Sequence, residues 1–471
     1  MISYEIVVFI FVNIVSSQSC YWNDGCAYQL FSSKTPYDAV RGDIRDYPTP
    51  PNCKAVALWS LNRHGNRNPD ESVIGRMRAV ANLQHEIVSS HHEGKGQLCA
   101  QDIEDLKRWR WNETLDVSIS FLTGVGYEEL YEIAKRLREK YPHLAGGDED
   151  DYYFRSRDDQ VTMTSAKAFV HGWTEGGQIS LPVDEPLDHD IWLEPYQYCE
   201  RYQQDVKKGQ ALVDQLQDYF NNPEFINVKS NVQTRLGIST QLSSEDVDSL
   251  YELCRFYRSW EPNLKSPWCA AFSNDDLLVM EYRDDVKHYY RNGYGSWVNV
   301  NLGAPVLKNL YENFENYLES KNTTRTLTAY FAHDTLFEMA LCAMGLYKDS
   351  FVLQGSNRDP DRLWRTSFIG GFSNNILAVL STCIETGGQN YRVQIFVNEK
   401  VTDLCPLEGC TWEEFDAYFQ RYTAANLDFC SMNYTGPVIF PENPAALPDG
   451  ASKIALTTWM LTACLALVYL R

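Results

Sequence analysis

Ala-Val-Ala-Leu-Trp at residues 55–59, followed by Arg-His-Gly-Asn-Arg-Asn-Pro at residues 63–69, is the stretch from which the architecture of this 471-residue chain can be inferred. The first five residues are continuously apolar, and such a short run is typical of a buried strand. Beyond Pro69, apolar residues recur at helical spacing from Glu71 to about Val88. The polar heptapeptide therefore lies where a strand passes into a helix, which is where open α/β sheets bind ligands.

Within this heptapeptide a histidine lies between two arginines. Arg63 and Arg67 each carry a planar guanidinium that can donate two parallel hydrogen bonds to an oxyanion. The neutral imidazole of His64 is a nucleophile, and the arginines would neutralise the oxygens of a phosphoryl group under attack. The alternative is a loop in which basic residues occur by chance. The pattern favours a phosphate site with His64 as the attacking group.

A second strand-to-helix junction far downstream carries another histidine. The apolar run at residues 327–332 is followed by His333 and Asp334, and then by an apolar helical segment through about Cys342. Phosphoryl transfer to a histidine requires a proton for the departing alkoxide, and a carboxylic acid at a second strand end can supply it. The alternative is a His-Asp pair that only caps a helix.

Together, Arg-His-Gly-x-Arg-x-Pro and the distant His-Asp resemble the signature of the histidine acid phosphatases. The resemblance implies hydrolysis through a phosphohistidine at His64, with Asp334 as the proton donor. It also implies that Arg63, Arg67 and His333 hold the phosphate. No metal and no organic cofactor is implied, so activity is expected to survive a chelator.

A third junction follows a run of aromatic residues and ends in Arg155. In the family, an arginine followed ten and eleven residues later by Ser-Ala is a further phosphate ligand, and Arg155, Ser165 and Ala166 have this spacing. The family often has another arginine six residues on, where this chain has Val161. Arg157 is the candidate substitute, and a surface ion pair is the alternative role for Arg155.

One branch of the family shares additional segments with this chain. Lys34-Thr-Pro-Tyr resembles the Lys-Thr-x-Tyr segment of the multiple inositol polyphosphate phosphatases. The resemblance runs from about Cys20 to Cys430 and includes residues 122–124, 136–138, 272–276, 281–282, 293–295 and 397–399. Many members of the branch have His-Ala-Glu where this chain has His-Asp-Thr, a change that keeps a carboxyl group and shortens its reach. Lys34 is a candidate contact for additional phosphates, with a solvated lysine as the alternative.

We therefore predict an α/β fold with a histidine-phosphatase-like core sheet flanked by helices and a second, mostly helical inserted domain. The core is expected over residues 18–186 and 301–440, and the insertion over residues 187–300. Further strands are expected at residues 376–380 and 393–397, and helices at residues 196–220, 244–260, 275–291 and, behind a capping box, 411–422.

Both ends of the chain resemble processing signals. Residues 1–17 are predicted to be a signal peptide, since an apolar run ends in small residues. Residues 441–453 resemble a linker with an anchor-attachment region, and residues 454–471 a hydrophobic tail that is replaced by a glycosylphosphatidylinositol anchor. A membrane-spanning helix and a retained tail in a soluble protein are the alternatives. The expected location is the cell surface, or otherwise a secreted or luminal one.

The number of cysteines agrees with passage through the secretory pathway. Removal of Cys464 with the tail leaves an even number of the 13 cysteines, which is typical of a secreted chain with disulfides. Cys254 with Cys269, and Cys405 with Cys410, are close enough in sequence for local bridges. No zinc-ligand spacing is present, so we predict no metal site. Glycosylation is predicted at three sequons, at Asn112, Asn322 and Asn433.

The net charge of −21 argues against nucleic acid as a partner. A polyanionic substrate would have to be attracted by a local basic cleft. The resulting hypothesis is a secretory-pathway phosphomonoesterase that acts on inositol polyphosphates such as inositol hexakisphosphate, with 2,3-bisphosphoglycerate as a second candidate substrate. The alternatives are a broad-specificity acid phosphatase and a catalytically silent, lipid-anchored binding protein.

Overall fold

The computed structural model describes residues 20–23, 28–174, 181–319, 325–385 and 388–441. The predicted signal peptide, the sequon at Asn322 and the tail beyond residue 441 lie outside these residues. Within them, no helix combines the length and the apolar character that crossing a membrane requires.

A seven-stranded sheet forms the centre of the described structure, in the order β2-β3-β1-β4-β5-β6, with β7 paired to β5. The strands are β1 (Cys53–Arg63), β2 (Tyr152–Ser156), β3 (Leu327–Ala332), β4 (Asn375–Glu385), β5 (Gly388–Val397), β6 (Lys400–Val401) and β7 (Cys410–Thr411). β1, β2 and β3 run parallel, whereas β4 and β5 are antiparallel to their neighbours. All the predicted strands are confirmed, and several are longer than expected.

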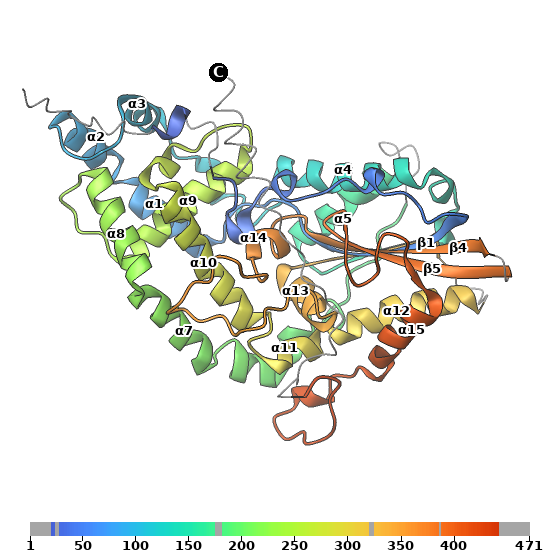
Figure 1. Ribbon diagram of the computed structural model, residues 1–471. Helices are drawn as coiled ribbons and strands as arrows, with labels where there is room; N and C mark the ends of the chain where they lie inside the picture. Colours follow the sequence, from blue (N-terminus) through green and yellow to red (C-terminus); the bar gives the residue numbers. More distant parts are fainter. Residues whose placement is uncertain (1–19, 24–27, 175–180, 320–324, 386–387, 442–471) are drawn as a thin grey trace, which may run out of the picture.

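Helices cover both faces of the sheet (Figure 1). Trp59 and Leu61 of β1 belong to one buried apolar cluster and Leu58 belongs to another, as expected when alternate side chains point to opposite faces. One face is covered by α4 (Gly124–Lys140) and α5 (Gln160–Trp173), and the other by α12 (Ala304–Leu318), α13 (Asp334–Ala343) and α15 (Trp412–Phe419). This layering confirms the predicted α/β class with a sheet flanked by helices.

Residues 187–300 contain helices and no strand, in the region drawn from green to yellow in Figure 1. The longer helices are α7 (Gln210–Asn221), α8 (Pro223–Leu236), α9 (Ser244–Trp260) and α10 (Asn274–Arg291), and the shorter ones are α6 (Pro195–Tyr198) and α11 (Trp297–Leu302). The boundaries of an inserted domain stay a prediction.

Two of the expected helices are interrupted. The helix expected at residues 71–88 is α1 (Glu71–Ala81) followed by α2 (Gln84–His92). The run expected at residues 196–220 is broken before α7, where Gly209 lies so close to the preceding turn that a Cβ would be 2.0 Å from the carbonyl oxygen of Asp205. Apolar periodicity continues across such breaks, so it does not reveal them. The capping box between Thr411 and Glu414 is confirmed.

Disulfides link distant parts of the chain. The local bridges Cys254–Cys269 and Cys405–Cys410 are present as predicted. Three long-range bridges join Cys20 to Cys99, Cys53 to Cys383, and Cys199 to Cys430. Cys342 is buried in α13 and is not part of a disulfide. Disulfides of this number are typical of proteins that mature in an oxidising compartment.

Candidate active site

The two histidine motifs meet at the carboxyl ends of adjacent parallel strands. His64 follows β1 and His333 follows β3, and the backbone N–H of His64 donates to the carbonyl oxygen of Ala332 at 3.1 Å. The two imidazole rings lie edge to face with their centroids 5.0 Å apart. The sheet therefore brings together residues that are far apart in the sequence, at the edge where open α/β sheets bind ligands.

His64 is buried and held in one orientation. Its Nδ1 is 2.8 Å from the carbonyl oxygen of Gly65, which can only accept, so Nδ1 carries the proton and Nε2 keeps its lone pair. Gly65 is required there because a Cβ would be 2.2 Å from the carbonyl oxygen of Gly126. Burial and the charges of Arg63 and His333 hold the pKa of His64 well below its ordinary value. The lowered pKa favours the neutral ring, the form in which an imidazole nitrogen can act as a nucleophile.

Arg63 is the last residue of β1 and directly precedes His64, and its side chain is almost fully buried. Nη1 donates to the carbonyl oxygens of Ser33, at 2.8 Å, and Gly370. Nη2 is 3.2 Å from Oδ2 of Asp334, and the guanidinium stacks on Phe372. The buried Nε of Arg63 has no hydrogen-bond partner.

Asp334 is the first residue of α13, and its side chain is 23% exposed. Burial alone would raise the pKa of its carboxyl group, but Arg63, His288 and Lys34 outweigh burial and hold the pKa well below the ordinary value. Without substrate, Asp334 is therefore a carboxylate at neutral pH. A phosphate dianion bound to Arg63 would neutralise part of this positive charge and raise the pKa.

His333 makes its strongest contact with an acid that the sequence did not single out as a site residue. Its Nε2 is 2.8 Å from Oδ2 of Asp159, which also caps α5 through the backbone N–H of Thr162. Arg157 approaches the same carboxylate at 3.2 Å. The orientation of the His333 ring thus depends on a residue at the beginning of a different helix.

Arg67 and Lys34 both lie near this centre. Arg67 pairs with Asp70 at 3.1 Å, and its charge contributes to the lowered pKa of His64. Lys34 donates to Oγ of Ser33 at 2.9 Å and lies over the ring of Phe372, on which Arg63 also stacks. Burial, helped by the nearby charges of Arg255 and Arg67, lowers the pKa of Lys34 to about 7.

Arg155 makes its contacts away from His64 and His333. Its Nη2 is 2.5 Å from Asp190, and the side chain lines a cavity of about 400 Å³ between β2, β3 and α12. Arg157, two residues further on, contacts Asp159 and so lies on the side of His333. The structure thus brings five of the predicted residues together around His64, namely Lys34, Arg63, Arg67, His333 and Asp334, and places Arg157 on the same side, whereas Arg155 contacts Asp190.

Glu129 of α4 holds the segment that follows His64 through hydrogen bonds. It accepts from the backbone N–H of Asn66 at 3.0 Å and from the hydroxyl of Ser373 at 2.7 Å, while the N–H of Ser373 donates to the carbonyl oxygen of His64. Burial raises the pKa of Glu129 to about 7. A single acid inside a helix has no distinguishing pattern, so the sequence could not indicate this role.

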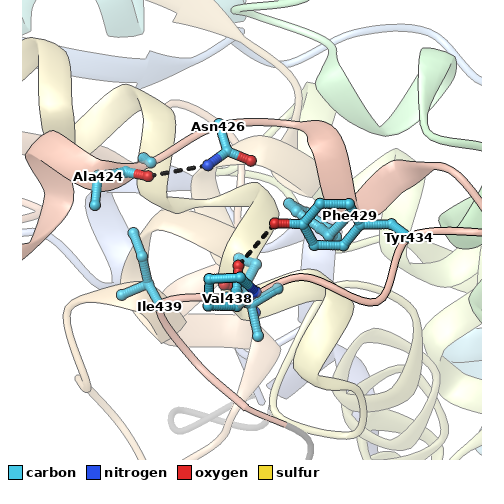
Figure 2. Close-up of a pocket in the computed structure, with 9 residues that line it drawn as sticks. Ala424, Asn426, Phe429, Tyr434, Val438 and Ile439 are labelled. Atoms are coloured by element: carbon cyan, nitrogen blue, oxygen red, sulfur yellow. Dashed lines mark hydrogen bonds between the residues drawn. The ribbon is translucent and has the colours of Figure 1, made fainter.

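Another cavity, of about 270 Å³, lies beside the C-terminal segment and is shown in Figure 2. Its walls are apolar or carry amides, and Asn426 and Tyr434 bond to the neighbouring carbonyls of Ala424 and Pro437. No arginine, histidine or carboxylate lines it, so it lacks the groups that phosphate chemistry needs. Among the described residues, the side chains close enough to share a metal ion are Cys20, Cys99 and Asp102, and the disulfide occupies both sulfurs.

A neutral histidine beside a buried arginine and a strand-end carboxyl group defines a site for phosphoryl transfer. Residues 57–398 match the model of the histidine phosphatase superfamily, branch 2. The chain belongs to this family, and it is a phosphoric monoester hydrolase.

The chain is similar to proteins named multiple inositol polyphosphate phosphatase 1. It is 31% identical to the one from Drosophila melanogaster over 86% of this chain and 88% of the relative. It is 25% identical to the human one over 79% of this chain and 82% of the relative.

Solved structures share the fold. The phytase from D. castellii superimposes with a TM-score of 0.68 at 17% identity, over 84% of this chain and 85% of its own. The multiple inositol polyphosphate phosphatase of Bifidobacterium longum in complex with inositol hexasulfate gives 0.62 at 13% identity, over 80% and 94%.

Proposed function

We propose that the protein hydrolyses inositol polyphosphates, such as inositol hexakisphosphate, through a phosphohistidine at His64. The observation that carries this proposal is the buried ring of His64, whose Nδ1 is held by the carbonyl oxygen of Gly65 and whose centroid is 5.0 Å from that of His333. The names of the relatives support the class of substrate.

In the proposed first step, Arg63, Arg67 and His333 hold the phosphoryl oxygens, with Arg157 as an additional candidate. Nε2 of His64 attacks phosphorus, the P–O bond to the inositol breaks, and its electron pair leaves with the oxygen, which takes the proton of Asp334. In the second step a water attacks the phosphohistidine, Asp334 takes the proton of that water, and the P–N electron pair returns to Nε2. This cycle regenerates both groups.

A polyphosphate needs more cations than the reacting phosphate does. Lys34 provides one beside Arg63. The sequence did not indicate Lys287 and Arg291, which follow one another at helical spacing on α10 and, within the described residues, pair with no carboxylate within 4 Å. Like charges at this spacing destabilise a helix, and a bound polyanion would remove that cost. The helices of residues 187–300 would in this way form one wall of the cleft.

Lys34→Met is expected to raise KM for inositol hexakisphosphate about tenfold, because a lost charged hydrogen bond of about 1.4 kcal/mol corresponds to that factor. KM for an aryl monophosphate should change little. As the pKa of Lys34 is about 7, the wild-type enzyme should lose affinity for the polyphosphate as the pH rises through 7. Lys54→Met, on the exposed beginning of β1, is the control, and an equal effect on both substrates would reject this role.

The same assay separates the alternatives. Phosphate release would be measured from inositol hexakisphosphate, 2,3-bisphosphoglycerate and an aryl phosphate, each in competition with the others. Cleavage of the aryl phosphate without a preference for the polyphosphate would favour a broad acid phosphatase. Silence on all three would favour a binding protein and would reject the proposed function.

We also propose maturation in the secretory pathway, with a lipid anchor replacing the tail. The disulfides support the pathway, and Asn112 and Asn433 are exposed and accessible for glycosylation. Release of activity from intact cells by a phosphatidylinositol-specific phospholipase C tests the anchor. Activity that stays on the cells would instead favour a spanning segment.

A further inference from the structure

A second buried histidine lies behind Asp334 and comes from the helical region. His288 of α10 places Nδ1 at 2.8 and 2.9 Å from the two carboxylate oxygens of Glu338. Asn292, which directly follows α10, donates to the same carboxylate at 2.9 Å. All three side chains are buried, so these contacts persist away from water and hold the ring of His288 in one orientation.

Glu338 connects this arrangement to the reacting groups. It lies four residues after Asp334 on α13, so both side chains occupy the same side of the helix. It also lies against Gly370, where a Cβ would be 2.2 Å from Oε1 of Glu338. The carbonyl oxygen of Gly370 accepts from Arg63, the partner of Asp334. Glu338 is therefore in contact with the backbone that anchors the phosphate-binding arginine.

The chemistry of the proposed reaction does not use His288 or Glu338, although burying two titratable groups is costly. Nδ1 donates to Glu338, and within the described part of the chain Nε2 makes no hydrogen bond. After Arg63, His288 is the group whose charge most lowers the pKa of Asp334. His288 and Glu338 are thus placed where their charges can influence Asp334, the proposed proton donor.

On the basis of the proposed function, we propose that His288, held by Glu338 and Asn292, is a positioning residue that sets how strongly Asp334 holds its proton during the reaction. In its cationic form, the ring stabilises the carboxylate that Asp334 becomes when it has protonated the leaving oxygen. Glu338 supplies the counter-charge that keeps the ring in place. No proton leaves His288, and no additional reactant is needed.

Several other groups act on Asp334, and the test must separate His288 from them. The cations are Arg63 of β1, Lys34 of the preceding loop, Arg291 of α10 and His333, and the remaining groups are Glu338, Tyr196 and Tyr202. A change at position 288 alters none of these side chains but removes the partner of Glu338, so His288→Lys, which restores a cation opposite Glu338, is needed to separate the charge from the lost contact.

The experiment measures kcat against pH, for the aryl phosphate and for inositol hexakisphosphate, in wild type, His288→Gln and His288→Lys. His288→Gln puts an uncharged side chain at this position, so the alkaline limb, where Asp334 loses its proton, should move up by about one pH unit. His288→Lys keeps a cation opposite Glu338 and should return the limb to its wild-type position. His85→Gln on the exposed side of α2 should leave the profile unchanged.

A structural role predicts a different result. If His288→Gln lowers kcat at every pH without moving the limb, or if His288→Lys shifts it as much as His288→Gln does, the proposal is overturned. An inactive wild type would reject the proposed function, whereas an active enzyme with an unmoved limb rejects this inference alone.

Discussion

His64→Ala is expected to lower kcat for inositol hexakisphosphate by about 10⁴-fold or more, as found when a covalent nucleophile is removed. The loss should be this large because His64 would form the covalent intermediate, whereas the neighbouring ring of His333 is held through Nε2 by Asp159. Rapid quenching should trap an acid-labile phosphoenzyme in the wild type and none in the variant. Thermal denaturation should show that the variant is folded.

His92→Ala, at the exposed end of α2, is the matched control and should retain both activity and the phosphoenzyme. Substantial turnover by His64→Ala, or a phosphoenzyme of unchanged yield, would assign the nucleophile to another residue. Loss of phosphoenzyme together with loss of folding would be resolved with His64→Asn, which keeps a polar side chain in the buried position.

Asp334→Asn is expected to lower kcat for inositol hexakisphosphate by about 10²- to 10⁴-fold, the usual contribution of a general acid. The loss for 4-nitrophenyl phosphate should be much smaller in the first step, because a nitrophenolate leaves without a proton. Since Asp334 would also activate the water of the second step, the variant should release a burst of nitrophenolate and accumulate phosphoenzyme.

Asp361→Asn, an exposed acid far from β3 in the sequence, is the control and should behave as wild type. An equal loss on both substrates without a burst would show that Asp334 contributes only by pairing with Arg63. The same result would point to a different proton donor.

The pH profiles of kcat and kcat/KM should reflect the effect of Arg63 on the pKa of Asp334. His64 must be neutral, and its lowered pKa places the acidic limb below the ordinary value for histidine. Asp334 must be protonated, and its pKa is lowered in the free enzyme but rises when phosphate binds. The profile should therefore be bell-shaped with an acidic to near-neutral optimum, and the alkaline limb of kcat should lie at higher pH than that of kcat/KM. A flat profile from pH 4 to 9 would contradict both roles.

The sequence by itself determined the α/β class and indicated the groups that are proposed to react. Each of His64 and His333 directly follows an apolar strand, and a strand followed by a helix places its last residues at the binding edge of a parallel sheet. These relations are local, and local relations can be inferred from periodicity and motif. The two short disulfide loops were predictable for the same reason.

Only the tertiary structure decided which groups support that centre. Asp159 and His333 are 174 residues apart, and His288 and Glu338 are 50 apart, so their contacts depend on how α5, α10 and α13 pack against one another. The different surroundings of Arg155 and Arg157 also depended on packing, because Arg155 lies in β2 and Arg157 directly follows it, while their partners, Asp190 and Asp159, lie in separate segments. Burial and neighbouring charge, which set the proton affinities of His64, Asp334 and Lys34, exist only in the folded chain.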